Sequence, residues 1–205
     1  MSIKTIAALM SLGFALVAGP AWSQQAPEEL IKQVSTDVLE SVKADKSIQA
    51  GDVKQVMALV DAKVMPHVNF QRMTSSAVGR YWRQATPDQQ KRLQDEFKTL
   101  LVRTYSGALS QVKDQTVSLK PMRGNPGDAE VVVRTEVRGK GDPVQLDYRL
   151  EKAASGWKIF DVNVMGVWLV ENYRNSFAQE ISSNGIDGLI AKMAERNKTA
   201  SANRG

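Results

Sequence analysis

The spacing of hydrophobic residues changes twice along this chain, and this change constrains the fold more than any other feature. Apolar residues recur at helical spacing over 27–113, alternate with polar residues over 115–165, and return to helical spacing over 167–197. No internal repeat and no long linker separates these segments. The pattern predicts a single α+β domain over 24–197, in which helices from both ends of the sequence cover one sheet.

Within the middle segment, 131–137 and 144–150 alternate strictly between apolar and polar residues. Turn sequences rich in glycine separate them from each other and from a shorter candidate strand at 117–121. Together with the apolar run 157–165, they predict a curved antiparallel sheet of about four strands with one apolar face. The last strand is apolar on both sides: we expect Phe160, Val162 and Val164 on one face, and Trp157, Ile159 and Met165 on the other.

The two ends of the sequence are expected to lie outside this domain. Lys4 precedes an apolar run over 6–18 that is too short to span a bilayer, and small residues flank a cleavage site after Ser23. We therefore expect 1–23 to be a signal peptide that directs the chain to a bacterial periplasm; an uncleaved anchor is the alternative. The polar residues 198–205 are expected to form a disordered tail.

The composition excludes several kinds of chemistry. The sequence has no cysteine and one histidine, His67, which excludes a thiolate metal site, a cysteine nucleophile and a multi-histidine metal site. Glycine motifs that bind phosphates or dinucleotides are missing. The formal net charge is +5 and the basic residues are spread along the chain, so nucleic-acid binding is not expected. We expect neither a cofactor nor a metal ion.

Polar residues on the predicted strands are the main candidates for catalysis. Asp161 and Asn163 stand between apolar neighbours, where burial would raise the pKa of an aspartate and suit it to act as a base. Structural hydrogen bonding to the adjoining helices is the other interpretation. One alternative function is therefore an enzyme on a cone-shaped sheet, with Asp161 or Asp147 as base and Tyr148 as proton donor toward a small apolar substrate.

Several segments resemble a known family, and they cover nearly the whole chain after 23. They are 73–74, 79–83, 86–90, Phe97 with 100–105, 157–162, 166–174 with Phe177, and 185–190. These segments are similar to MlaC, the periplasmic phospholipid-binding component of the Mla lipid-transport system, also called the toluene-tolerance family. Two positions depart from the family pattern: Asn69 stands where Asp is usual, and Trp168 stands where a small residue is usual.

The resemblance implies a sheet like that of nuclear transport factor or cystatin proteins, extended by a helical subdomain. It implies a deep apolar cavity that takes the acyl chains of a phospholipid, and a carrier that catalyses no reaction and maintains outer-membrane lipid asymmetry. The implied partners are an outer-membrane lipoprotein–porin complex and an inner-membrane ABC transporter with its substrate-binding subunit. A monomer is expected.

The cavity lining is predicted from the apolar faces that the helices and the sheet turn inward. Periodicity alone does not separate lining from solid core, and a filled core would indicate a structural or chaperone-like interaction module instead. The predicted lining residues are Met57, Val60, Phe70, Met73, Tyr81, Phe97, Leu101, Tyr105, Val133, Leu146, Tyr148, Val164, Val170 and Tyr173.

Overall fold

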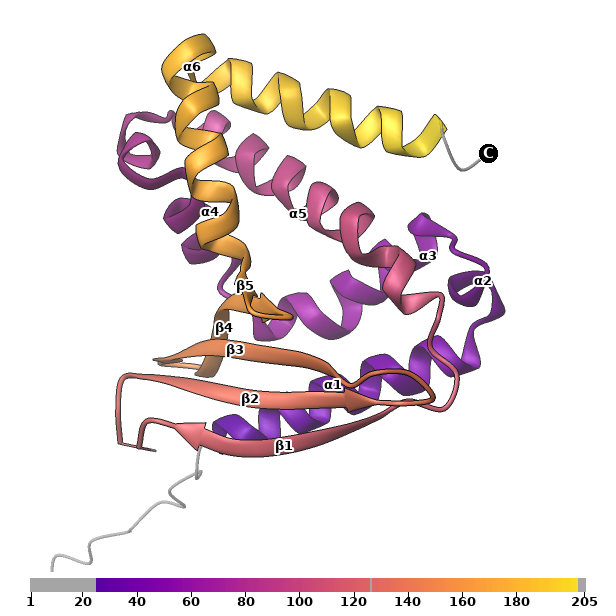
Figure 1. Ribbon diagram of the computed structural model, residues 1–205. Coiled ribbons are helices and arrows are strands. Elements are labelled where there is room, and N and C mark those ends of the chain that lie inside the picture. The colour runs from indigo at the N-terminus through magenta and orange to yellow at the C-terminus, as the bar shows by residue number, and fades with distance from the viewer. Residues whose placement is uncertain (1–24, 126, 203–205) are drawn as a thin grey trace, which may run out of the picture.

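The computed structural model describes residues 25–125 and 127–202, and it shows helices from both ends of the chain packed around one curved sheet (Figure 1). The α+β class and the predicted order of helices, strands and helices are confirmed. The predicted signal peptide lies outside the described residues. None of the described helices combines the length and the hydropathy needed to cross a membrane.

The first helical segment consists of one long helix and several short ones. α1 (Pro27–Ala44) has its proline in the first turn, where the missing N–H costs nothing. Asp45 and Asp52 cap the next two helices by accepting backbone N–H groups. The elements that follow α1 are α2 (Lys46–Gln49), α3 (Val53–Leu59), the π-helical η1 (Val60–Val64) and the 3-10 turn η2 (Met65–His67).

The second helical segment contains the long helix α5 (Pro87–Leu109). Its predicted start is confirmed by a capping box: Thr86 Oγ1 accepts the Gln89 N–H at 3.2 Å, and Gln89 Oε1 accepts the Thr86 N–H at 3.0 Å. Before it, α4 (Phe70–Val78) and the 3-10 helix η3 (Gly79–Gln84) follow one another directly.

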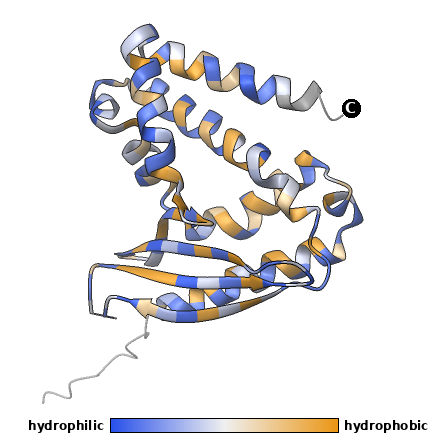
Figure 2. Cartoon of the chain, viewed as in Figure 1, coloured by the Kyte–Doolittle hydropathy of each residue, from blue (hydrophilic) through white to orange (hydrophobic). Residues whose placement is uncertain are grey.

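In the described part of the chain, five strands form one antiparallel sheet in the order β1-β2-β3-β4-β5. The strands are β1 (Thr116–Arg123), β2 (Glu130–Arg138), β3 (Val144–Ala153), β4 (Gly156–Val164) and β5 (Val167–Trp168). Val133 pairs with Tyr148, and Tyr148 pairs with Val162. We call the side that carries these three residues the inner face. Figure 2 shows the alternation of apolar and polar residues along the strands.

A bulge in β4 decides which of its residues face inward. The pairing register between β3 and β4 shifts by one residue at Phe160. One extra residue reverses the alternation of side chains, so Ile159 and Val162 both belong to the inner face. The expectation that Trp157 and Ile159 lie opposite Val162 and Val164 is therefore wrong.

The last helix, α6 (Leu169–Ala202), folds back on itself at Gly185. Gly185 has φ 74° and ψ 179°, a conformation that is essentially restricted to glycine. The two arms of α6 meet there at a sharp angle, and the second arm lies alongside α5 (Figure 1). The tail that was expected to be disordered from 198 is helical as far as Ala202.

Among the described residues, buried apolar side chains form three clusters. The helical cluster, between α4, α5 and α6, centres on Phe97, whose ring lies 5.1 Å from that of Tyr173 and 5.2 Å from that of Phe177. The sheet cluster joins α1 to the inner face, with Ile31 and Val133 among its members. The α3 cluster joins α3 to the C-terminal parts of α1 and α5.

Candidate functional site

One end of the inner face is solid core. Val131, Val133 and Leu150 are buried there, and they pack in one cluster with Leu30 and Ile31 of α1. Val133 is 0% exposed. A ligand therefore has no access to this end of the sheet without displacing α1.

The other end of the inner face carries apolar side chains that stay half-buried. Val137 pairs with Val144, and Leu146 pairs with Val164, so these four side chains are neighbours on one face of three adjacent strands. Among the described residues, they belong to none of the three core clusters. Each retains partial exposure. We call these four residues the open strip.

The helices add half-buried apolar side chains on the same side of the sheet. Met57 and Val60 flank the α3 cluster, which includes the C-terminal part of α1, the helix that covers the inner face. Leu101 of α5 flanks the helical cluster. Tyr105, one turn further along α5, is also half-buried, and burial raises the pKa of its hydroxyl. Sheet and helices thus both present apolar surface that the described chain leaves partly uncovered.

The predicted lining residues fall into two groups. Five are fully buried in the core clusters: Met73, Phe97, Val133, Val170 and Tyr173. The others are half-buried: Met57, Val60, Phe70, Tyr81, Leu101, Tyr105, Leu146, Tyr148 and Val164. The half-buried group stays a prediction for ligand contact, because its members keep exposed surface, whereas the buried group keeps almost none.

Tyr148 stands at the boundary between the solid end of the inner face and the open strip. Its hydroxyl forms hydrogen bonds with Ser35 of α1 and with Thr135 of β2. Burial raises the pKa of this hydroxyl, and the two hydrogen bonds partly oppose that rise. Thr135 in turn donates its hydroxyl to the carbonyl of Leu146 at 2.9 Å. The Tyr148 hydroxyl therefore links α1 to the sheet by hydrogen bonds, next to the open strip.

Asp161 has the structural role that was one of its two interpretations. Its Oδ1 accepts the backbone N–H of Val170 at 3.0 Å and that of Val162 at 2.9 Å, and its Oδ2 accepts from Arg149 at 3.0 Å. Burial raises the pKa of Asp161, and these donors act against that shift. The carboxylate caps the first turn of α6 and is 1% exposed.

The acid and base of the alternative enzyme are not brought together. Tyr148 lies on the inner face, while its neighbour Asp147 lies on the other face, where its carboxylate is 3.9 Å from Arg134. Asp161 shares that outer face, because it pairs with Arg149. The strand alternation therefore turns both candidate bases away from the candidate proton donor.

The two positions that depart from the family pattern have local explanations. Asn69 caps α4 by accepting the Arg72 N–H at 3.0 Å, and its amide donates to Glu151 at 2.6 Å, which an aspartate at that position cannot do. The ring of Trp168 stacks under the Arg149 guanidinium, 3.9 Å from its centre. Since Trp168 pairs with Asn163 on the outer face, its ring does not enter the open strip.

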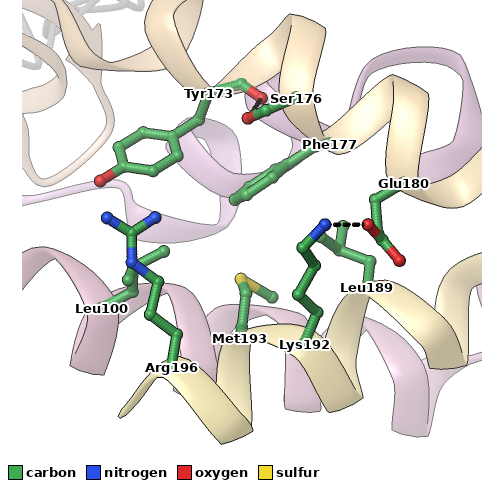
Figure 3. A pocket seen from close by; sticks show the side chains of 9 residues that line it. All are labelled: Leu100, Tyr173, Ser176, Phe177, Glu180, Leu189, Lys192, Met193 and Arg196. Carbon is green, nitrogen blue, oxygen red and sulfur yellow. Dashed lines mark hydrogen bonds and ion pairs between the residues drawn. The ribbon is translucent and has the colours of Figure 1, made fainter. Parts of the chain in front are cut away.

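A small cavity lies in the angle between the two arms of α6, over α5 (Figure 3). Its volume is about 100 Å³. It is lined by Leu100, Tyr173, Ser176, Phe177, Glu180, Leu189, Lys192, Met193 and Arg196. Lys192 and Glu180 form an ion pair across it. Sequence reasoning missed this cavity except for Tyr173, because the sharp turn at Gly185 that creates it leaves no signal beyond the glycine itself.

Metal-binding geometry is missing from the part of the chain that the structure describes: no three side chains of His, Asp or Glu are grouped to hold an ion. His67 lies in the turn η2, half-buried. Burial, and then the charge of Lys158, lower the pKa of His67.

These features define an α+β protein in which a curved sheet and its covering helices share a partly uncovered apolar region on the inner face. The family model described as "MlaC protein" matches residues 32–195. The chain therefore belongs to the MlaC family, as the sequence resemblance predicted.

Two curated relatives match this chain over most of their own length. The toluene tolerance protein Ttg2D of Pseudomonas putida is 26% identical over 183 residues, which cover 86% of this chain and 85% of the relative. The intermembrane phospholipid transport system binding protein MlaC of Haemophilus influenzae is 22% identical over 184 residues, which cover 88% of this chain and 86% of the relative.

A solved structure shares both the fold and a large part of the sequence. It is a phospholipid-binding protein from Ralstonia solanacearum, determined in complex with a phospholipid. It superposes with a TM-score of 0.84 at 46% sequence identity, and the match covers 86% of this chain and 99% of the other. The fold described above is thus one that accommodates a phospholipid in a related protein.

Proposed function

We propose that this protein is a periplasmic phospholipid carrier of the Mla system, which holds the acyl chains of its cargo between the open strip of the sheet and the helices. One observation carries the proposal: the Ralstonia solanacearum protein, 46% identical and with the same fold, was solved with a phospholipid bound. The half-buried apolar side chains on the inner face support it, because they supply the kind of surface that acyl chains cover.

The physical need for such a protein follows from the cargo. Two acyl chains hold about 30 methylene groups, and removing each from water is worth about 0.8 kcal/mol, or roughly 25 kcal/mol in all. A phospholipid therefore does not cross an aqueous compartment at a useful rate unless its chains stay covered. The head group is stable in water, so it needs no enclosed pocket.

The contact residues that we propose are the half-buried members of the predicted lining. Leu146 and Val164 lie on the open strip, and Leu101, Tyr105 and Met57 lie on the helices. The cavity beside Gly185 is not assigned to the cargo, because charged groups of Glu180, Lys192 and Arg196 stand in its lining.

The carrier is proposed to exchange lipid with an outer-membrane lipoprotein–porin complex and with an inner-membrane ABC transporter through its substrate-binding subunit. In this way it would maintain the lipid asymmetry of the outer membrane. The signal peptide predicted over 1–23 would deliver it to the periplasm. It binds and releases its cargo without making or breaking a covalent bond, and a partner that separates sheet from helices would favour release.

Native mass spectrometry of the protein purified from the periplasmic fraction tests this function. We expect the mass of one bound phospholipid, identified by extraction and thin-layer chromatography. After the lipid has been removed, incubation with phosphatidylethanolamine and phosphatidylglycerol vesicles should restore the bound form. A protein that is lipid-free when purified, and that takes up no lipid from the vesicles, would contradict the proposal.

A further inference from the structure

The hairpin between β4 and β5 exposes apolar side chains at its tip. Met165 and Gly166 form a two-residue loop, with φ of 53° and 91°, between Val164 and Val167. Met165 is 71% exposed and Val167 is 49% exposed. Large exposed hydrophobic residues are few in the described chain, and Leu119 on the opposite edge strand is the other one.

Turn geometry does not explain a methionine at this position. A two-residue hairpin loop with positive φ at both central residues favours Asn, Asp or Gly, and a positive φ is uncommon for other residues. The tip is nevertheless well fixed. The Met165 N–H donates to the carbonyl of Gln145 at 3.0 Å, and the Gly166 N–H donates to Asn163 Oδ1 at 2.8 Å. The apolar side chain is therefore held outward by an ordered backbone.

The tip is continuous with the open strip. Val167 pairs with Val164, and Val164 pairs with Leu146, so these side chains form one apolar row across β5, β4 and β3 on the inner face. Exposure rises along this row, from half-buried Leu146 to Val167, and reaches its highest value at Met165. The row thus leads from the partly covered interior to the edge of the sheet.

We propose that Met165 and Val167 form the rim of a portal, where acyl chains of the cargo slide between the open strip and an acceptor. This inference rests on the proposed carrier function. An acyl chain that leaves the open strip along this row keeps apolar contact until it reaches the sheet edge, so less of it meets water at any moment. The unbranched thioether of methionine adapts to a moving chain.

The test compares lipid transfer by the lipid-loaded wild-type protein with transfer by the double variant M165D/V167D. Each protein carries pyrene-labelled phosphatidylcholine, and acceptor vesicles contain phosphatidylethanolamine and phosphatidylglycerol. We expect the transfer rate of the double variant to fall roughly tenfold, the factor that corresponds to lost contact with about two methylene groups. Lipid occupancy and melting temperature should stay those of the wild type. The matched control is S182D/S183D, which adds the same two negative charges at exposed residues of α6, outside the sheet, and should transfer at the wild-type rate.

Three outcomes would overturn the portal. Transfer by M165D/V167D at the wild-type rate would show that the tip is not on the path. An equal loss in S182D/S183D would show a general effect of surface charge. A wild-type dimer that the double variant converts to a monomer, as measured by sedimentation, would assign the tip to a second copy of this chain. Wild-type protein that carries no lipid at all would instead overturn the proposed function itself.

Discussion

The carboxylate of Asp161 on β4 accepts the backbone N–H of Val170 in the first turn of α6 at 3.0 Å. This contact joins the sheet to the C-terminal helix in the interior, where Asp161 is 1% exposed. The same oxygen accepts the Val162 N–H at 2.9 Å. One side chain therefore fixes where α6 leaves the sheet.

Replacing Asp161 should reveal this role through stability. Asp161→Ala leaves two N–H groups without their acceptor, at about 1–3 kcal/mol each. Asp161→Asn keeps one side-chain oxygen that can accept both N–H groups, and it loses chiefly the ion pair with the partly exposed Arg149. Urea denaturation should therefore rank the free energy of unfolding as wild type, then Asn, then Ala. Equal losses in the two variants would contradict the capping role.

Two tryptophan substitutions should separate solid core from ligand-contacting surface. Val133 is 0% exposed beneath α1, so Val133→Trp should lower the free energy of unfolding by about 1–3 kcal/mol or more. Leu146 is half-buried on the open strip, so Leu146→Trp should leave the stability of delipidated protein nearly unchanged while less phospholipid co-purifies. Thermal melts and lipid counts by mass spectrometry measure both effects. If Leu146→Trp unfolds and keeps its lipid, the cargo does not contact the open strip.

Acid unfolding should depend on Glu136. Hydrogen bonds from Lys120 and then Arg138 lower the pKa of Glu136 in the folded state. A lowered pKa means that this contribution to stability is present above the pKa of the unfolded chain and is lost as the pH falls through the folded pKa. Glu136→Gln should therefore be less stable than the wild type at pH 7, and the difference should shrink toward pH 3. A constant difference across this range, measured by urea titrations at each pH, would contradict the assignment.

The kink of α6 should require the glycine at position 185, whereas the glycine at position 107 in α5 should be replaceable. Gly185→Ala forces a side chain into φ 74°, ψ 179°, and should cost about 1–3 kcal/mol of stability. Gly107 lies within α5, where an added Cβ meets nothing within 4 Å. Gly107→Ala should stabilise the protein by about 0.4–1 kcal/mol, because it restricts the unfolded chain. Comparable melting temperatures for the two variants would show that the kink tolerates alanine.

Hydrophobic spacing was sufficient to predict most of the fold. The alternation over 131–137 and 144–150 placed β2 and β3, and the Thr86 capping box placed the start of α5. Periodicity failed where one residue changes the pattern. The bulge at Phe160 reverses the alternation within β4, and no local composition marks it.

The candidate site was harder to predict because burial depends on which helix covers which part of the sheet. Val133 and Leu146 occupy equivalent apolar positions in the alternating sequences of neighbouring strands. Yet α1 covers Val133 and does not cover Leu146. Sequence spacing contains no information about the angle at which α1 crosses the sheet. Met165 was assigned to a strand face, although the turn that it forms with Gly166 places it at the tip.

The edges of the sheet have a consequence for solubility at high concentration. A sheet with apolar side chains on a partly uncovered face is a template for pairing with other chains, and pairing begins at unprotected edge strands. Here one edge is β5, which is two residues long, and the other is β1, which carries Lys120, Pro121 and a register shift before Arg123. Short length, charge, proline and irregularity all oppose the addition of a further strand. The protein can thus keep apolar surface available without offering neighbouring molecules a backbone on which to aggregate.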